Sequence, residues 1–226
     1  MKLSIKYKKR TLIISLCVSV FVPFFIFQHF PNKNQAIDAR EIIVAWSPAS
    51  KQEAADSYAP TAFSSGNHTA TLTRSDGIAI LSSYGNGAKE IPQHAYYSRG
   101  WGADSQWWQL SGISTLGFEN VQLSFWTKGS ATGPKNFTLE YSIDGNEWYP
   151  LTNSNNTLVS YSISAENKAQ QHGPYSLNAA VNNQGQLHIR FINANGQGIS
   201  ADTVGSTGTN YIADITMTAV LLPNDH

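Results

Sequence analysis

The chain has 226 residues and a formal net charge of zero, but its charges are unevenly divided along the sequence. Residues 1–37 hold six Lys and Arg residues and no acid, so residues 38–226 carry nine bases, 15 acids and a net charge of −6. Aromatic residues make up 12% of the chain, which argues against a disordered body, and an acidic body with few bases argues against nucleic-acid binding.

The first segment predicts export. Met1–Arg10 is basic, an almost wholly apolar run follows over 11–27, and polar residues resume at Gln28. This order is typical of a secretory signal peptide that is cut after Ala36 or Ala39. The alternative is an uncleaved anchor, because a run of 17 residues lies at the lower limit for spanning a bilayer. In both cases the preceding positive charge places the rest of the chain outside the cytoplasm, either secreted or held at the cell envelope.

After a hydrophobic targeting helix within residues 1–39, residues 40–226 are predicted to form a single all-β domain. Its predicted strands show period-two alternation or are short segments of the same character: Ile42–Trp46, Thr69–Thr73, Ile78–Leu81, Trp107–Leu110, Val121–Thr127, Phe137–Ile143, Leu158–Ile163, Tyr175–Leu177, Leu187–Phe191 and Ile215–Leu221. Turn signals such as Asp144-Gly145 and Asn195-Gly196 separate them. Many strands with one apolar face favour an antiparallel two-sheet sandwich.

The middle of this pattern resembles a known family. Trp107-Trp108, the run 117–125, the run 130–137, and Tyr141–Gly145 with Trp148 are similar to bacterial extracellular jelly-roll modules of galactose-binding-like type. Such modules are attached to secreted nucleases, phosphatases and glycan-active enzymes. The resemblance implies a jelly-roll sandwich with a non-catalytic role.

The same resemblance implies that a structural calcium ion is bound near the chain ends by carboxylates and backbone oxygens. The candidate ligands are Glu41, Asp56, Asp76 and Asp214, with Asp214 and Glu41 preferred. The alternative for Asp214 is a strand-end residue that bonds to backbone amides.

No catalytic motif stands out. Glu140, Asp144 and Glu147 are the only close carboxylates within a good strand and turn, and the turn argues against their meeting in one cleft as a glycosidase requires. A Gly-x-Ser-x-Gly nucleophile elbow, a closely spaced His pair and a glycine-rich phosphate loop are all absent from the sequence. The sequence therefore predicts a protein that is not an enzyme, and an enzyme with an unrecognised site is the remaining alternative.

The strongest functional hint is aromatic. Trp126 lies on the polar side of its predicted strand, and neighbouring strands could place Glu140 and Ser142, or His188 and Arg190, on the same face. An indole ring beside hydrogen-bonding groups suits a sugar, whose C–H face stacks on the ring while its hydroxyls meet polar atoms. The alternative is that a crossing loop covers Trp126.

A second aromatic cluster runs from Tyr96 to Trp108. It offers Tyr97, Trp101 and Trp108 as ligand contacts on a loop rim, and the alternative is packing of a long connection against the sandwich edge. Trp46 and Trp148 are expected to be buried.

We therefore expect an exported, non-catalytic binding module for a carbohydrate or another cell-surface ligand, with a protein partner also open. The alternative is a structural or assembly protein of the cell envelope or extracellular matrix, which needs only an exposed apolar patch. Membrane contact is expected only through the N-terminal segment, if that segment is uncleaved.

Overall fold

The computed structural model describes residues 39–49, 55–75, 81–84, 94–102 and 105–223, all of which belong to one compact unit, 38–226. The predicted leader and most of the predicted strand Ile78–Leu81 lie outside the described residues. Within the described part, no helix is long and apolar enough to cross a membrane.

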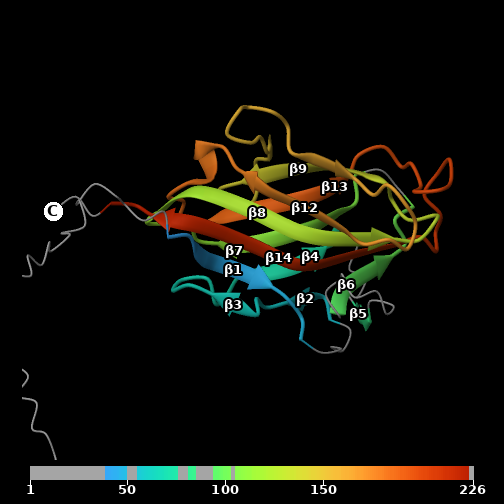
Figure 1. Cartoon of the computed structure of the whole chain (residues 1–226), viewed down its shortest axis with the longest axis horizontal. Helices are drawn as coiled ribbons and strands as arrows, with labels where there is room; N and C mark the ends of the chain where they lie inside the picture. The colour runs from blue at the N-terminus through green and yellow to red at the C-terminus, as the bar shows by residue number, and fades with distance from the viewer. Residues whose placement is uncertain (1–38, 50–54, 76–80, 85–93, 103–104, 224–226) are drawn as a thin grey trace, which may run out of the picture. The chain divides into compact units, whose positions relative to one another are not determined.

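The described strands form two antiparallel sheets of seven strands each (Figure 1). Sheet I has the order β12 (Gln170–Ser176), β8 (Phe118–Gly129), β14 (Thr209–Leu221), β1 (Glu41–Trp46) and β3 (Ala62–Phe63), with β6 (His94–Arg99) paired to β14 and β5 (Leu81–Tyr84) paired to β6. Sheet II has the order β10 (Tyr149–Pro150), β9 (Asn136–Ser142), β13 (Leu187–Asn193), β7 (Trp107–Ile113), β4 (Thr71–Arg74) and β2 (Ser57–Tyr58), with β11 (Ser160–Ser162) paired to β9. A short 3₁₀ helix, η2, spans Ala179–Val181. The predicted all-β, antiparallel two-sheet sandwich is confirmed.

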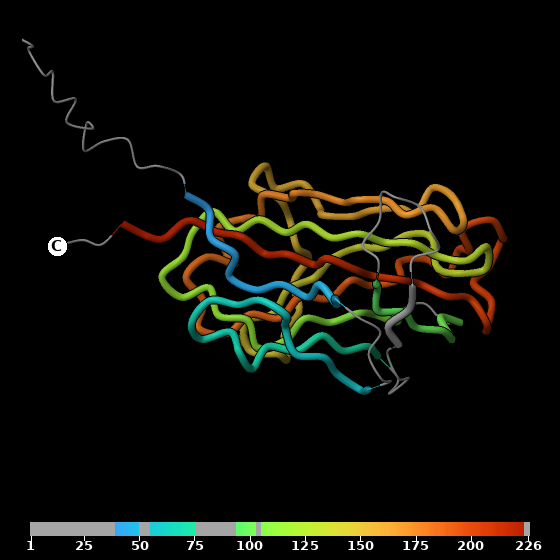
Figure 2. Tube along the Cα trace, turned by 60° about the horizontal axis from the view of Figure 1, so that its bottom comes forward, coloured from blue at the N-terminus to red at the C-terminus, as the bar shows by residue number. Residues whose placement is uncertain are grey.

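Alternation along each strand decides which side chains enter the core. In β8, Val121, Leu123 and Phe125 are fully buried while the residues between them are only half-buried. The same alternation holds in β13, where Ile189 and Phe191 face inward. Because successive side chains in a strand point to opposite faces, the residues between these buried ones face the outside of the sandwich. The first and last strands, β1 and β14, run side by side in sheet I (Figure 2).

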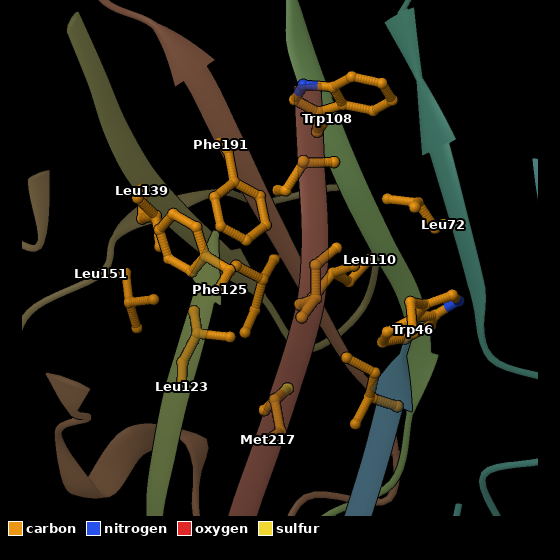
Figure 3. Packing of buried hydrophobic residues seen from close by; sticks show 14 of the residues in the cluster. Trp46, Leu72, Trp108, Leu110, Leu123, Phe125, Leu139, Leu151, Phe191 and Met217 are labelled. Carbon is orange, nitrogen blue, oxygen red and sulfur yellow. The ribbon is translucent and has the colours of Figure 1, made fainter. Parts of the chain in front are cut away.

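Large aromatic side chains fill the space between the sheets. Trp46, Trp101 and Trp108 are fully buried, and Phe125 of sheet I packs edge-on against Phe191 of sheet II with 4.9 Å between ring centroids (Figure 3). Each buried indole N–H has an acceptor: the Nε1 of Trp46 donates to a backbone carbonyl 3.1 Å away, that of Trp101 to one 3.2 Å away, and that of Trp108 to the Asn210 side chain at 2.7 Å. The core therefore buries these three indole N–H groups without leaving any of them unpaired.

This burial corrects the expectation that Trp101 and Trp108 contact a ligand. Both side chains are 0% exposed, and their rings pack against each other with centroids 5.7 Å apart. For Trp108 the reason is the phase of β7, which turns it inward with Leu110 and turns Trp107 outward. Trp101 lies after β6 and packs against Trp108 and Phe137. Trp46 is buried, as predicted.

We expect Trp108→Phe to lower the free energy of unfolding by about 2–4 kcal/mol, because it leaves a void and removes the donor to Asn210. The measurement is urea denaturation followed by circular dichroism. The matched control is Trp126→Phe on the half-buried outer side of β8, which should cost about 1 kcal/mol or less. Equal losses of unfolding free energy in the two variants would show that the buried Trp108 ring does not stabilise the fold more than the outer Trp126 ring does.

Candidate functional site

A row of polar side chains crosses the outer face of sheet II. Arg190 of β13 pairs with Gln109 of β7 on one side and with Glu140 of β9 on the other. Gln109 in turn pairs with Thr73 of β4. Residues directly opposite each other in paired strands share a face, so Thr73, Gln109, Arg190 and Glu140 form one line, and all four are half-buried.

Two indole rings lie against Arg190, the cation of this row. The guanidinium carbon of Arg190 lies 4.5 Å from the ring centroid of Trp107 and 3.7 Å from that of Trp148. Its Nε donates to the Gln109 side-chain oxygen at 2.7 Å, and Gln109 donates onward to Ser111 at 2.6 Å. We call Trp107, Gln109, Glu140, Trp148 and Arg190 the Arg190 cluster. Cation–π contact and hydrogen bonding together hold its central side chain in place.

The cluster combines opposite charges beside aromatic surface. Burial lowers the pKa of Arg190, and the nearby carboxylate of Glu140 opposes that change. The guanidinium remains a cation at neutral pH because arginine titrates far above that range. The face therefore offers two indole rings, a planar donor and carboxylate and amide acceptors.

A tight turn after β9 places Trp148 over Arg190. One carboxylate oxygen of Asp144 accepts from the backbone N–H of Asn146 at 2.8 Å, the backbone N–H of Glu147 at 2.9 Å and the Ser142 hydroxyl at 2.9 Å. These hydrogen bonds, led by that from Asn146, lower the pKa of Asp144. Gly145 has a φ of 78°, a left-handed conformation that glycine adopts without strain. The sequence signal Asp144-Gly145 thus correctly located a turn.

His188 lies beneath this turn. Its side chain is 8% exposed, its ring centroid is 6.3 Å from that of Trp148, and among the described residues neither ring nitrogen has a hydrogen-bond partner. Burial lowers the pKa of His188, Arg190 acts in the same direction, and Asp144 opposes them. His188 is therefore neutral at pH 7 and packs as a flat, uncharged ring.

The sequence-based site is divided between two sheets. Glu140 and Arg190 lie side by side in sheet II. Trp126, however, is in β8 of sheet I, so the prediction that it joins them is wrong. Strand alternation is a local property, whereas sheet membership depends on pairings between distant segments, and Trp126 was assigned without that information. Tyr97 is half-buried and lies in β6, which also belongs to sheet I.

Trp107 and Trp148 are the site residues that the sequence reasoning missed. Trp148 was expected in the core, but it is half-buried and lies against Arg190. Its position directly after a turn, before the two-residue strand β10, was the available signal that it does not belong to a long core strand. Trp107 was discoverable as the outward neighbour of an inward Trp108.

The two carboxylates predicted to bind calcium do not meet. Glu41 begins β1 opposite Ala219, whereas Asp214 adjoins Ile215, which pairs with the far end of β1. The two carboxylates therefore lie near opposite ends of β1, and the rise per residue of a strand puts roughly 15 Å between these ends. Asp214 instead accepts a hydrogen bond from the Ser47 hydroxyl and adopts a φ of 43°. Within the described ranges, no three His, Cys, Asp or Glu residues gather closely enough to hold a metal.

Comparisons with known proteins concern the fold. No protein-family model matches the chain, and no curated protein matches it. Solved structures similar to it include TmCBM61 in complex with β-1,4-galactotriose, at 11% identity over 66% of this chain and 87% of that one, with a TM-score of 0.39. The CBM22-1 xylan-binding domain of Xyn10C from Paenibacillus barcinonensis matches at 13% identity over 83% of this chain and 100% of that one, with a TM-score of 0.40.

A third similar structure is the K1 cleaved adhesin domain of Lys-gingipain from Porphyromonas gingivalis W83, at 14% identity over 66% of this chain and 89% of that one, with a TM-score of 0.41. Carbohydrate-binding modules are therefore among the structures similar to this chain. The case for a ligand rests on the Arg190 cluster itself.

The turn that carries Trp148 should respond to acid. Because the folded pKa of Asp144 is below its ordinary value of 3.8, its hydrogen bonds stabilise the fold above pH 3.8, and this contribution is lost as the pH falls through the folded pKa. We expect nuclear magnetic resonance to show the Asp144 carboxyl titrating below 3.8. Asp144→Asn keeps an acceptor oxygen and should retain the turn, whereas Asp144→Ala should release it. An unshifted titration would show that the carboxylate does not bind these donors.

Proposed function

We propose that the chain is a non-catalytic binding module for carbohydrate and that the Arg190 cluster is its sugar-binding surface. The observation that carries the proposal is the guanidinium of Arg190 held between the rings of Trp107 and Trp148 on an outer sheet face. Half-buried tryptophan beside ordered polar groups matches the two needs of a sugar, an apolar ring face for its C–H groups and hydrogen-bond partners for its hydroxyls.

Each polar member has a distinct role in this proposal. The terminal amino groups of Arg190 donate to hydroxyl oxygens, while the carboxylate of Glu140 accepts from hydroxyl protons. Gln109 fixes the orientation of Arg190 through its 2.7 Å hydrogen bond. The contacts among these side chains order the surface before a ligand arrives, which reduces the entropy lost on binding.

The carboxylates around the cluster support binding rather than glycoside hydrolysis. Hydrolysis generally requires two carboxyl groups on either side of one glycosidic bond. Asp144 is engaged by three donors of its own turn, and Glu147 accepts from the Tyr149 hydroxyl at 2.7 Å. These two acids therefore serve the turn, and Glu140 is left as the carboxylate of the polar row.

We also propose that the module is exported. The support is the order of the N-terminal sequence, in which a basic stretch precedes the apolar run 11–27. Outside the cytoplasm the chain would meet polysaccharides of a cell surface or of the surrounding medium.

An assembly role is the second candidate, because large apolar side chains are exposed away from the Arg190 cluster. Ile42 in β1 is 49% exposed, Phe63 in β3 is 51% exposed and Leu221 in β14 is 52% exposed. All three belong to sheet I, so a protein partner bound there would leave the outer face of sheet II open.

We expect Trp148→Ala to weaken binding of neutral polysaccharides by about tenfold or more, because it removes one ring face and loosens Arg190. Affinity gel electrophoresis of the full chain against galactan, xylan and glucan measures this without relying on tryptophan fluorescence. Phe63→Ala, which truncates an exposed aromatic ring on the other sheet, is the control and should bind as the wild type does.

A second variant separates binding from folding. Arg190→Gln should reduce the affinity for the polysaccharide while changing the midpoint of urea unfolding no more than a typical surface substitution does. Wild-type chain that is retarded by none of the neutral glycans, or variants that are retarded as strongly as wild type, would require the carbohydrate proposal to be abandoned.

A further inference from the structure

The outer face of sheet I carries a second aromatic and cationic surface. Tyr97 of β6 pairs with Tyr211 of β14, and Tyr211 pairs with Lys128 of β8, so the three side chains form a row across neighbouring strands. Trp126 lies two residues before Lys128 and therefore on the same face. We call Tyr97, Arg99, Trp126, Lys128 and Tyr211 the Tyr211 strip.

The two tyrosine rings of the strip stack on each other, and each lies beside a cation. Tyr97 and Tyr211 stack with centroids 5.3 Å apart and an interplanar angle of 26°. The Lys128 ammonium lies 4.9 Å from the Tyr211 ring centroid, and the Arg99 guanidinium carbon lies 5.8 Å from that of Tyr97. Tyr97, Trp126 and Tyr211 are half-buried and Arg99 is exposed, so solvent reaches these side chains, whereas Lys128 is 7% exposed.

The strip is positively charged within an acidic domain. The strand segments that form it, His94–Arg99, 126–129 and 209–213, contain no Asp or Glu, whereas residues 38–226 carry a net charge of −6. Asp214, the next acid along β14, is engaged by the Ser47 hydroxyl. Burial lowers the pKa of Lys128, which means that its charge is poorly solvated and would be stabilised by a bound anion.

The strip is separate from the Arg190 cluster. Its strands β6, β8 and β14 all belong to sheet I, while the Arg190 cluster lies on β7, β9, β13 and the turn that precedes β10 in sheet II. The buried core lies between the two sheets, so the outer faces point to opposite sides of the sandwich.

We propose that the Tyr211 strip is a second glycan-binding surface, selective for anionic sugars that carry carboxylate or sulfate groups. The stacked tyrosine rings and Trp126 would contact the C–H faces of successive sugars, while Lys128 and Arg99 would pair with their acidic groups. A neutral glycan would cover Lys128 without compensating its charge, and this disfavours neutral chains on the strip. The inference does not depend on the Arg190 cluster binding sugar.

The test is affinity gel electrophoresis of the full chain with polygalacturonate, dextran sulfate or uncharged dextran in the gel. We expect retardation by at least one of the two anionic polysaccharides and not by dextran, and the two anionic gels distinguish carboxylate from sulfate. Lys128→Met, which keeps the length of the side chain and removes its charge, should weaken that affinity about tenfold and reduce its dependence on salt. Tyr211→Leu should also weaken it, since stacking is lost while the charge remains.

Lys135→Met removes one positive charge outside the strip and is the matched control, which should behave as wild type. Wild-type chain that neither anionic polysaccharide retards would overturn the inference, as would equal losses in the two lysine variants. Loss of anionic binding in Trp148→Ala but not in Lys128→Met would place the acidic sugar on the Arg190 cluster instead. Lys128-dependent binding to phosphatidylserine vesicles without polysaccharide binding would replace a glycan with a membrane surface. Neutral-glycan binding is measured independently, so failure here leaves the proposed function untouched.

Discussion

The packing of aromatic rings between the two sheets is the interaction on which the rest of the molecule depends. Phe125 and Phe191 meet across the sandwich, and Trp101 packs on both Trp108 and Phe137. Since these rings take the inward positions of their strands, the intervening residues must face outward. The hydrophobic requirement of the core thereby determines which polar and aromatic side chains are available on each outer face.

How far the sequence predicts this structure depends on the range of the interaction. The alternation of Val121, Leu123 and Phe125 is local, and it correctly identified both the strand and its buried side. The neighbours of that strand are set by pairings between distant segments, so Trp126 was wrongly grouped with residues of the opposite sheet. Trp148 was misplaced for a related reason, because a single tryptophan after a turn gives no periodicity from which its direction can be read.

The two outer faces use the same physical elements in different proportions. On sheet II, Arg190 is enclosed by indole rings and balanced by Glu140, so the surface combines donors and acceptors. On sheet I, Lys128 and Arg99 lie beside tyrosine rings in strand segments that contain no acid. Charge balance rather than aromatic content therefore distinguishes the two faces, and one scaffold presents both without altering its core.

The pairing of β1 with β14 has a mechanical consequence. The chain enters the described fold at the start of β1, whose backbone is joined along Glu41–Trp46 to the central strand β14. If a polymer were bound to either face, tension applied through the residues before β1 would pull β1 along its own axis. The hydrogen bonds of an antiparallel pair lie across the strands, so they would bear this shear load together rather than open one after another. Tension between the two termini would instead peel the same strands apart from their shared end, because Glu41 lies opposite Ala219 near the end of β14.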